Sequence, residues 1–565
     1  MVGASSTSSI QALKTVAVLG ASYGGARVAC LLANGLPQNW RVVLIDRNSH
    51  MNHLYVLPRY AVLPGHEHKA FIPYDNVFLP PALPAASSSD PPQPPKDLSR
   101  HVRLHASVLS LREHELTLDK SFPEHGIPDQ TLRFEYLVYA LGSHLPSPIN
   151  LWGPVADEEV EKNGVVDVVR GTKEGGVAWL KRFQKRVERA SSVLVVGGGA
   201  LGIQYATDIA EIYPATRVTL LHSRHRLLPR FDEAMHTEIL SSLSALNVCT
   251  ILGDRLDLSS LEKGTDVSGA ERIVRTQSGR EIRAELVLLC TGQTPNTALL
   301  RETYPNVIVP DGPNKGMARV RRTLQLAEPV DEAEVPAPVS QEPLASAEPV
   351  SESAQSPVQE LETALAQVEL EGEEETEGAE GAEEDEPEPE PAPPIEEDPH
   401  TRVAAEHIFA IGDAADAFGA VNAGHNAFFQ GEVAARNILR LVERDERRAA
   451  KSASSLDSAP SSSAPSAELS TDSAADSDVE LDKYNPGAPA IKVSLGLTKS
   501  VYQFQGMIGT RDKEPADLDV HLIWRYFGHQ VEREDLEHDP EAAPAPAAAL
   551  EKHAGRGGEG HAVSV

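Results

Sequence analysis

The chain has 565 residues, 41% of them hydrophobic and 24% charged, which is enough material for several domains with large cores. Its formal net charge of −32 is concentrated in one segment, because residues 327–399 contain 25 acidic and no basic side chains. The rest of the chain has 58 acidic and 51 basic side chains. This balance disfavours a general nucleic-acid-binding protein.

The three cysteines, Cys30, Cys249 and Cys290, are too few and too widely spaced for a disulfide scaffold, a zinc ribbon or a redox-active pair. No metal site is predicted. No apolar run reaches the length of a transmembrane helix, and the first 14 residues lack the apolar core of a signal peptide. We therefore expect a cytoplasmic protein.

Four segments rich in Pro, Ala, Ser or Glu are expected to be disordered, because they cannot bury enough apolar surface to offset the conformational entropy of ordering them. They are residues 80–98, 327–400, 447–482 and 531–565. The remaining sequence alternates apolar, β-branched runs with helical patterns. This alternation predicts an α/β protein with parallel sheets.

The first candidate nucleotide site follows the buried strand predicted at residues 15–19. The turn reads Gly20-x-Ser22-x-x-Gly25, a G-x-G-x-x-G pattern with Ser in the second place, and a helix follows. Asp46 ends the next strand, where a carboxylate can accept hydrogen bonds from a ribose diol. The candidate cofactor-binding residues here are Gly20, Ser22, Tyr23, Gly24, Gly25 and Asp46.

The second candidate site follows a strand at residues 193–196 and has the full pattern Gly197-x-Gly199-x-x-Gly202. The next strand ends in His222 instead of an acid, and Arg224 and Arg226 follow. A basic pocket suits the 2′-phosphate of NADP, although the two arginines also fit an exposed basic loop. Two such turns, each between a strand and a helix, predict two dinucleotide-binding sites.

With three later motifs, these turns resemble the flavoproteins with two dinucleotide-binding domains, the FAD/NAD(P)H pyridine nucleotide oxidoreductases. The motifs are residues 136–143 with Gly142, residues 290–296 with Gly292, and residues 407–413 with Asp413. The resemblance implies that Asp413 binds the ribityl chain of FAD. It also implies two Rossmann-like domains, with the FAD domain split around the NAD(P) domain, and a small C-terminal module.

Within this superfamily the chain is most similar to the ferroptosis-suppressor or apoptosis-inducing-factor-homologous branch. The residues that carry this similarity are 218–223, 423–426 and 484–487. By the same resemblance, Arg59 and Val108 contact FAD. Gln204 stands where the family usually has a Glu beside the nicotinamide.

The resemblance also implies a division of the chain. The expected parts are an FAD-binding domain in three pieces (14–152, 285–326 and 401–446), an NAD(P)H-binding domain (153–284) and a C-terminal module (483–530).

The expected function is oxidoreduction from NADPH or NADH, through noncovalent FAD, to a small acceptor, with a quinone favoured by the resemblance. Electrons should pass to the acceptor directly because no cysteine pair is present, and no catalytic side chain is identified. The alternatives are a different flavin reductase and a nucleotide-sensing flavoprotein acting in interactions or apoptosis-type signalling. The C-terminal module is a candidate for peripheral membrane or lipid contact, and the acidic insert for binding proteins.

Overall fold

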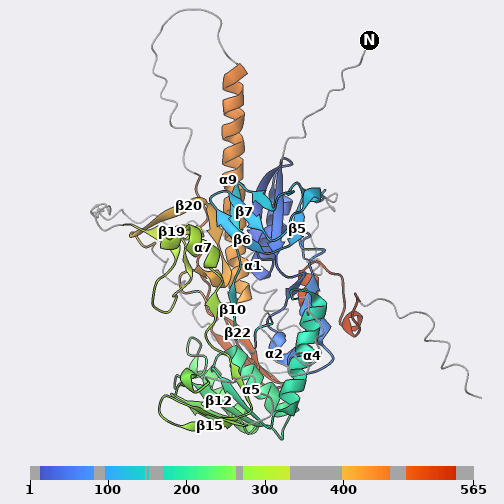
Figure 1. Ribbon diagram of the computed structural model, residues 1–565, viewed down its shortest axis with the longest axis vertical. Helices are drawn as coiled ribbons and strands as arrows, with labels where there is room; N and C mark the ends of the chain where they lie inside the picture. The colour runs from blue at the N-terminus through green and yellow to red at the C-terminus, as the bar shows by residue number, and fades with distance from the viewer. Residues whose placement is uncertain are drawn as a thin grey trace, which may run out of the picture.

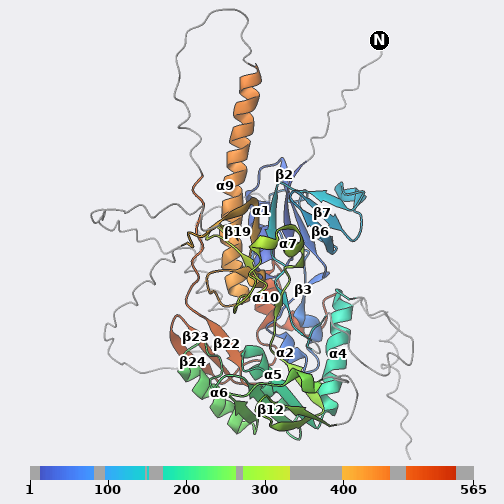
Figure 2. The ribbon, with the colours of Figure 1, turned by 60° about the vertical axis from the view of Figure 1, so that its left-hand side comes forward.

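The computed structural model describes residues 13–81, 96–146, 149–151, 170–261, 271–330, 397–457 and 479–541. Two bodies of sheet and helix lie at opposite ends of the long axis, and the C-terminal strands lie beside the second body (Figures 1 and 2). No helix in these ranges is long and apolar enough to cross a membrane. The α/β architecture predicted from the sequence is confirmed.

The first body is built on a six-stranded sheet of order β19-β20-β9-β1-β2-β5. All neighbours pair in parallel except β19 with β20, which pair antiparallel. Residues 15–19 of β1 are all buried, as expected for a parallel strand covered on both faces. The strands are β1 (Lys14–Leu19), β2 (Trp40–Asp46), β5 (Val102–His105), β9 (Tyr136–Tyr139), β19 (Gln325–Pro329) and β20 (Thr401–Ala410).

Helices α1 (Tyr23–Gly35) and α9 (Gly424–Asp457) pack against each other beside this sheet. Their close approach depends on small residues, since a Cβ added at Gly24 would lie 2.5 Å from the carbonyl oxygen of Ala427. The last turns of α9 extend beyond the sheet (Figure 1).

Smaller elements complete the first body. Two antiparallel sheets, one parallel strand pair and short helical segments lie in the connections between the strands. They are β3 (His50–Asn52), β4 (Phe71–Pro73), β6 (Val108–Arg112), β7 (Glu115–Leu118), β8 (Thr131–Arg133), β18 (Ala318–Arg319), β21 (Ala415–Asp416), α2 (Leu57–Tyr60), α7 (Ala298–Thr303), η1 (Glu67–Ala70), η2 (Pro123–His125), η4 (Pro305–Val307) and η6 (Gly412–Ala414).

The second body is built on a four-stranded parallel sheet of order β13-β12-β11-β16. The two bodies are connected through β10 (Ser143–His144) and β17 (Thr294–Pro295), which pair antiparallel. The elements of the second body are β11 (Ser192–Val196), β12 (Arg217–His222), β13 (Cys249–Leu252), β14 (Arg272–Arg275), β15 (Glu281–Ala284), β16 (Leu286–Leu289), α4 (Lys173–Arg189), α5 (Ala200–Ile212), α6 (Glu233–Ala245) and η3 (Leu258–Leu261).

The C-terminal module is an antiparallel sheet followed by a helix, and it contacts both bodies. Strand β22 packs on α5, β23 packs on α6, and α10 lies near η1 of the first body. Its elements are β22 (Ile491–Ser494), β23 (Ser500–Phe504), β24 (Met507–Arg511), α10 (Val520–Tyr526) and η8 (Glu534–Leu536).

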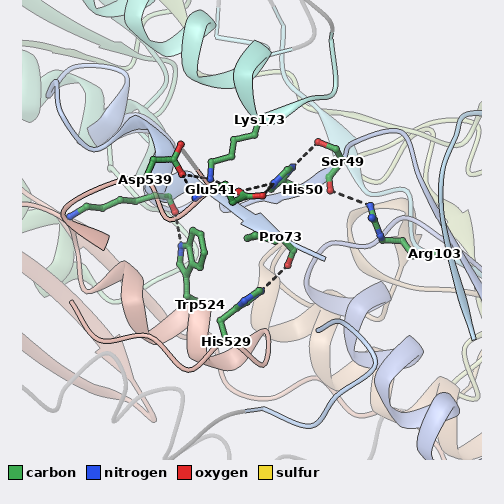
Figure 3. Close-up of polar contacts among 10 residues, drawn as sticks. Ser49, His50, Pro73, Arg103, Lys173, Trp524, His529, Asp539 and Glu541 are labelled. Carbon is green, nitrogen blue, oxygen red and sulfur yellow. Dashed lines mark hydrogen bonds and ion pairs between the residues drawn. The ribbon is translucent and has the colours of Figure 1, made fainter. Parts of the chain in front are cut away.

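The structure describes the segment after α10 as far as residue 541. The prediction that the disordered tail begins at residue 531 is therefore wrong for residues 531–541. Lys173, at the start of α4 and only 4% exposed, makes ion pairs with Asp539 (2.6 Å) and Glu541 (Figure 3). Glu541 also contacts His50 of β3. These contacts secure a polar segment that has little apolar surface of its own.

Two other predicted boundaries are wrong, because contacts with residues distant in the sequence determine where the elements end. Strand β16 pairs with β11 and therefore belongs to the second body, although the predicted domain ended at residue 284. Helix α9 continues to Asp457, eleven residues into the linker predicted at 447–482, and Asp482 at the other end of that linker makes an ion pair with Arg436 (2.7 Å).

The ends of the acidic insert are also ordered. Ala327 is buried in β19, and Glu397 makes an ion pair with Arg321. Residues 331–396, like 82–95 and 458–478, lie outside the described residues. The backbone N–H of Val330 donates to the carbonyl of His400 at 2.8 Å, so the two ends of the insert leave the sheet side by side.

Because the ends of the insert are adjacent, replacing residues 331–396 by about ten residues should leave the fold intact. Loop-closure entropy depends only logarithmically on length, so we expect the free energy of unfolding to rise by about 1–2 kcal/mol. Denaturant unfolding and flavin content of the shortened protein measure this. A folded protein that no longer binds flavin would show that the insert helps to build the site.

Candidate functional site

The first glycine turn joins β1 to α1 in the geometry that the sequence predicts. The N–H of Gly20 donates to the carbonyl of Ile45 at 2.8 Å, and the φ of Gly20 is +90°. A Cβ at Gly25 would lie 1.8 Å from the carbonyl oxygen of Gly20, so only glycine permits the helix to start this close to the strand. Ser22 is the N-cap residue and has extended backbone.

Two predicted cofactor-binding residues in this turn have additional structural partners. Gly24 provides the contact with α9. The ring of Tyr23 lies against Gly424 of α9, and its hydroxyl is 2.9 Å from Nδ1 of His53. The turn is therefore braced by the first residues of α9 and by the segment that follows β3.

Asp46 lies at the end of β2 with its carboxylate on the turn. One oxygen accepts the N–H of Ala21 and the other accepts the N–H of Asn48, each at 2.7 Å. Burial raises the pKa of Asp46, and these two hydrogen bonds oppose the rise. The structure thus places an acceptor beside the helix start, as a ribose diol would require.

A cavity lies where η6 meets α9, and it contains Asp413. The cavity is lined by Gly412, Asp413, Ala415, Ala417, Ala420, Val421, Asn422, Ala423, Asn426, Ala427 and Gln430. The carboxylate of Asp413 accepts a hydrogen bond from Ser143 Oγ at 2.8 Å, and burial raises its pKa. Gln430 Oε1 accepts the N–H of Gly412 at 2.7 Å, which fixes the backbone next to that carboxylate.

The second glycine turn has the same construction. The N–H of Gly197 donates to the carbonyl of Leu221 at 2.8 Å, and a Cβ at Gly202 would lie 1.9 Å from the carbonyl oxygen of Gly197. At Gly199 no atom lies within 4 Å of an added Cβ. Gly197 and Gly202 thus pack closely against the backbone, while the space next to Gly199 is open to a ligand.

His222 takes the place in the second turn that Asp46 takes in the first. Its Nδ1 accepts the N–H of Gly198 at 3.1 Å, which puts the proton of the neutral ring on Nε2. Burial lowers the pKa of His222, so the ring is neutral at neutral pH. Its Nε2 is buried and has no hydrogen-bond partner among the described residues. The sequence showed that an acid is missing here but did not indicate this contact.

The two arginines after β12 differ in their surroundings. Arg224 is exposed at the edge of the turn. Arg226 is half-buried, and its guanidinium donates to the backbone carbonyls of Pro229 (3.2 Å) and Phe231. Arg224 is therefore the better candidate for a 2′-phosphate, and Arg226 supports the loop.

Arg59 lies in α2 and has partners other than the flavin turn. It is 1% exposed and makes an ion pair with Asp208 of α5 at 3.0 Å, and it also donates to two backbone carbonyls of the C-terminal module. These contacts occupy the guanidinium, so the structure does not support its predicted role in binding FAD.

The remaining predicted residues lie on the connections and the edge of the first body. Gly142 and Gly292 have φ of +61° and +79° and flank the paired strands β10 and β17. Val108 is half-buried in β6, where it pairs with Leu118 of β7. Ser143 and Gln430 were not predicted as site residues, because only folding brings them to Asp413 and Gly412.

These residues fit two dinucleotides. Each turn has its helix N-terminus and the glycines that close packing requires, with Asp46 at the neighbouring strand end of the first turn and His222 at that of the second. Asp413 offers a carboxylate with one hydrogen bond from the described residues. The described residues contain no group of three His, Cys, Asp or Glu side chains that could hold a metal ion. The arrangement can therefore hold a flavin and a nicotinamide dinucleotide on adjoining domains.

The fold and the two turns define a flavin- and nicotinamide-dependent oxidoreductase. Residues 14–310 match the pyridine nucleotide-disulphide oxidoreductase family, and the chain belongs to that family. Members of this family bind FAD and NAD(P)H, so the predicted cofactors are confirmed at this level.

Among curated proteins, the chain is 36% identical over 523 residues to Fe-regulated protein 8 of Mycosarcoma maydis, covering 91% of this chain and 95% of the relative. It is 26% identical to ferroptosis suppressor protein 1 of Homo sapiens, over 55% of this chain and 70% of the relative. It is 24% identical to apoptosis-inducing factor homolog B of Dictyostelium discoideum, over 53% and 69%. These relatives confirm the predicted branch.

Among solved structures, a ferredoxin reductase from Rhodopseudomonas palustris aligns over 86% of this chain and 81% of its own, with a TM-score of 0.48 and 13% identity.

Replacing Asp413 by Asn should weaken FAD binding by about tenfold to a hundredfold, because an amide keeps the shape but loses a charged acceptor. Asp416→Asn is the matched control, since Asp416 lies three residues after Asp413 and its carboxylate accepts a hydrogen bond from Asn314 at 2.8 Å. Flavin titration of the two apoproteins measures the difference. Equal affinity in Asp413→Asn and the wild type would contradict the assignment.

Proposed function

We propose that the protein is a FAD-dependent NAD(P)H oxidoreductase that reduces a small acceptor, a quinone first of all, without a protein disulfide. The observation that carries this proposal is the placement of the cysteines, all three of which lie in the described part of the chain and are free. They lie on separate elements: Cys30 in α1, Cys249 on the edge strand β13, and Cys290 after β16.

The thiols of Cys30 and Cys290 are also unsuited to exchange chemistry. Burial raises the pKa of both, so they stay protonated, and a thiol is a poor nucleophile. Free cysteines favour a reducing compartment such as the cytoplasm. Electrons therefore leave the flavin site directly. Peripheral membrane contact through the C-terminal module and protein binding by the acidic insert stay predictions.

The residues proposed to hold FAD are Gly20, Ser22, Gly25, Asp46, Gly142 and Asp413. Backbone N–H groups at the start of α1 attract the pyrophosphate, Asp46 accepts from the ribose, and Asp413 accepts from the ribityl hydroxyls. When bound, FAD would supply the redox chemistry, the two-electron exchange between NAD(P)H and the acceptor, while the residues named here would hold and orient it.

For the nicotinamide dinucleotide, Gly197, Gly199 and Gly202 form the corresponding turn. A neutral His222 replaces the carboxylate that would repel a 2′-phosphate, and Arg224 lies next to it. This combination favours NADPH as the donor.

Anaerobic mixing tests the function directly. The purified protein should be yellow, should be bleached by NADPH, and should regain its colour when a quinone is added in the absence of oxygen. A flavoprotein that binds NADPH but is not reduced by it would instead support a nucleotide-sensing role. Reoxidation by oxygen alone would point to a different flavin reductase.

Arg224→Ala should raise the KM for NADPH about tenfold or more and leave the KM for NADH nearly unchanged, because only NADPH carries the phosphate that Arg224 would bind. Arg226→Ala is the control, since its guanidinium contacts loop carbonyls. Steady-state kinetics with both donors measure the ratio. An equal change for both donors in Arg224→Ala would show that this side chain does not contact the 2′-phosphate.

A variant with all three cysteines replaced by Ser should keep quinone reduction measurable. At the buried positions we expect a loss of stability of about 1–3 kcal/mol, because a hydroxyl is harder to bury than a thiol. Turnover per bound flavin and thermal unfolding separate the two effects. Loss of turnover in folded, flavin-loaded protein would exclude direct transfer.

A further inference from the structure

Arg59 lies where three parts of the molecule meet. Its Nε donates to Asp208 of α5 at 3.0 Å, and its two terminal nitrogens donate to the carbonyls of Gly496 and Leu497 in the turn between β22 and β23. The side chains of Arg59 and Asp208 are 1% and 0% exposed. One guanidinium in α2 of the first body thus holds both the second body and the C-terminal module.

Residues around Arg59 also connect the first body, the second body and the C-terminal module. The carbonyl of Tyr60 accepts from Gln184 of α4 at 2.7 Å, while the Tyr60 hydroxyl donates to the carbonyl of Asp517 at 2.8 Å. The N–H of Leu497 donates to Glu211 of α5 at 2.6 Å. All these partners lie within one buried junction around α2.

The junction is also connected to both glycine turns. On the flavin side, the residues before α2 contact the first turn and α9, because His53 is paired with Tyr23 and the Tyr55 hydroxyl accepts the N–H of Gly424 at 2.6 Å. On the nicotinamide side, Asp208 lies on α5, the helix that begins at the second turn.

The described part of the covalent connections between the two bodies is short. Among the described residues, the two-residue strands β10 and β17 are the strands that pair across this connection, and each follows a glycine with positive φ. Asn296, directly after β17, adds hydrogen bonds to Leu141 and Gly142. A Cβ at Gly142 or Gly292 would contact nothing within 4 Å, so these glycines are not wedged by neighbours. Contacts elsewhere therefore add to this short strand pair in setting the orientation.

We propose that Arg59 is a positioning residue that holds the two dinucleotide turns in the relative orientation needed for hydride transfer, an inference that rests on the proposed function. Hydride transfer needs the reacting atoms about 3–3.5 Å apart, and a misplacement of about 1 Å can cost about a hundredfold in rate. A small rotation about the two connections would produce such a displacement.

The chemistry of the pair explains why an arginine is used. Burial raises the pKa of Asp208, and the charge of Arg59 opposes that rise. The planar fork of a guanidinium can bind a carboxylate and two carbonyls at once, whereas the single ammonium of a lysine cannot reproduce that geometry.

The experiment compares Arg59→Lys with the double variant Arg59→Met/Asp208→Leu in full-length, flavin-loaded protein. The double variant removes both buried charges and fills the space with apolar side chains, which often preserves stability. The matched control is Arg27→Met/Glu432→Leu, because that ion pair (2.5 Å) connects α1 and α9 within one body.

Three quantities are measured: flavin content, the rate of flavin reduction at saturating NADPH, and the rate at which chemically reduced flavin is reoxidised by a quinone without NADPH. We expect both Arg59 variants to lower the reduction rate by about tenfold to a hundredfold, with flavin content and reoxidation unchanged. The control variant Arg27→Met/Glu432→Leu should keep the wild-type flavin content, reduction rate and reoxidation rate. An unchanged reduction rate, or equal losses in reduction and reoxidation, would overturn the proposal.

A readout independent of turnover follows the orientation itself. Spin labels on the exposed Cys249 and on an introduced Arg133→Cys, with Cys30 and Cys290 replaced by Ala, report the distance between β13 and β8. We expect one narrow distance distribution in protein that keeps Arg59, and a broader or shifted distribution in the double variant Arg59→Met/Asp208→Leu. If wild-type protein is not reduced by NADPH or NADH, the proposed function fails, whereas an unchanged distribution in the variant rejects the role of Arg59.

Discussion

Both candidate sites depend on one constraint, the contact of a helix's first turn with the end of the preceding strand. At Gly25 and Gly202 an added Cβ would lie less than 2 Å from a backbone carbonyl oxygen, so the contact exists only with glycine. This closeness directs the N–H groups at the start of each helix toward one point beyond the sheet. It also brings Asp46 and His222 within hydrogen-bonding distance of the turn.

The two sites share this backbone and differ in the charge at the strand end. The carboxylate in the first turn is an acceptor that suits a ribose diol, and the neutral imidazole in the second carries its proton on Nε2. The same geometry thus suits two different dinucleotides. The three cysteines are free and lie on separate elements, which supports the proposed transfer to the acceptor without a disulfide.

The C-terminal module adds a second constraint by filling the space between the two bodies. Its turn at residues 496–497 reaches α2 and α5 together, and the segment to residue 541 ends on the buried Lys173 at the start of α4. A buried charge such as Arg59 is costly unless it is paired and hydrogen-bonded, and here its partners come from α5 and from the C-terminal module. This is the physical reason that the parts form one junction.

The sequence alone determined the elements whose signals are local. Each glycine turn needs its glycines within six residues, and buried parallel strands appear as continuous apolar runs, so both dinucleotide-binding units and Asp46 could be named in advance. Asp413 was named through the resemblance to the family. Tertiary structure decided what depends on distant partners: that Arg59 binds Asp208, that Ser143 meets Asp413, that β16 joins the second sheet, and that residues 531–541 are ordered. A charged side chain has no period in the sequence that identifies its partner, because the ion pair or hydrogen bond exists only after the fold has brought the two groups together.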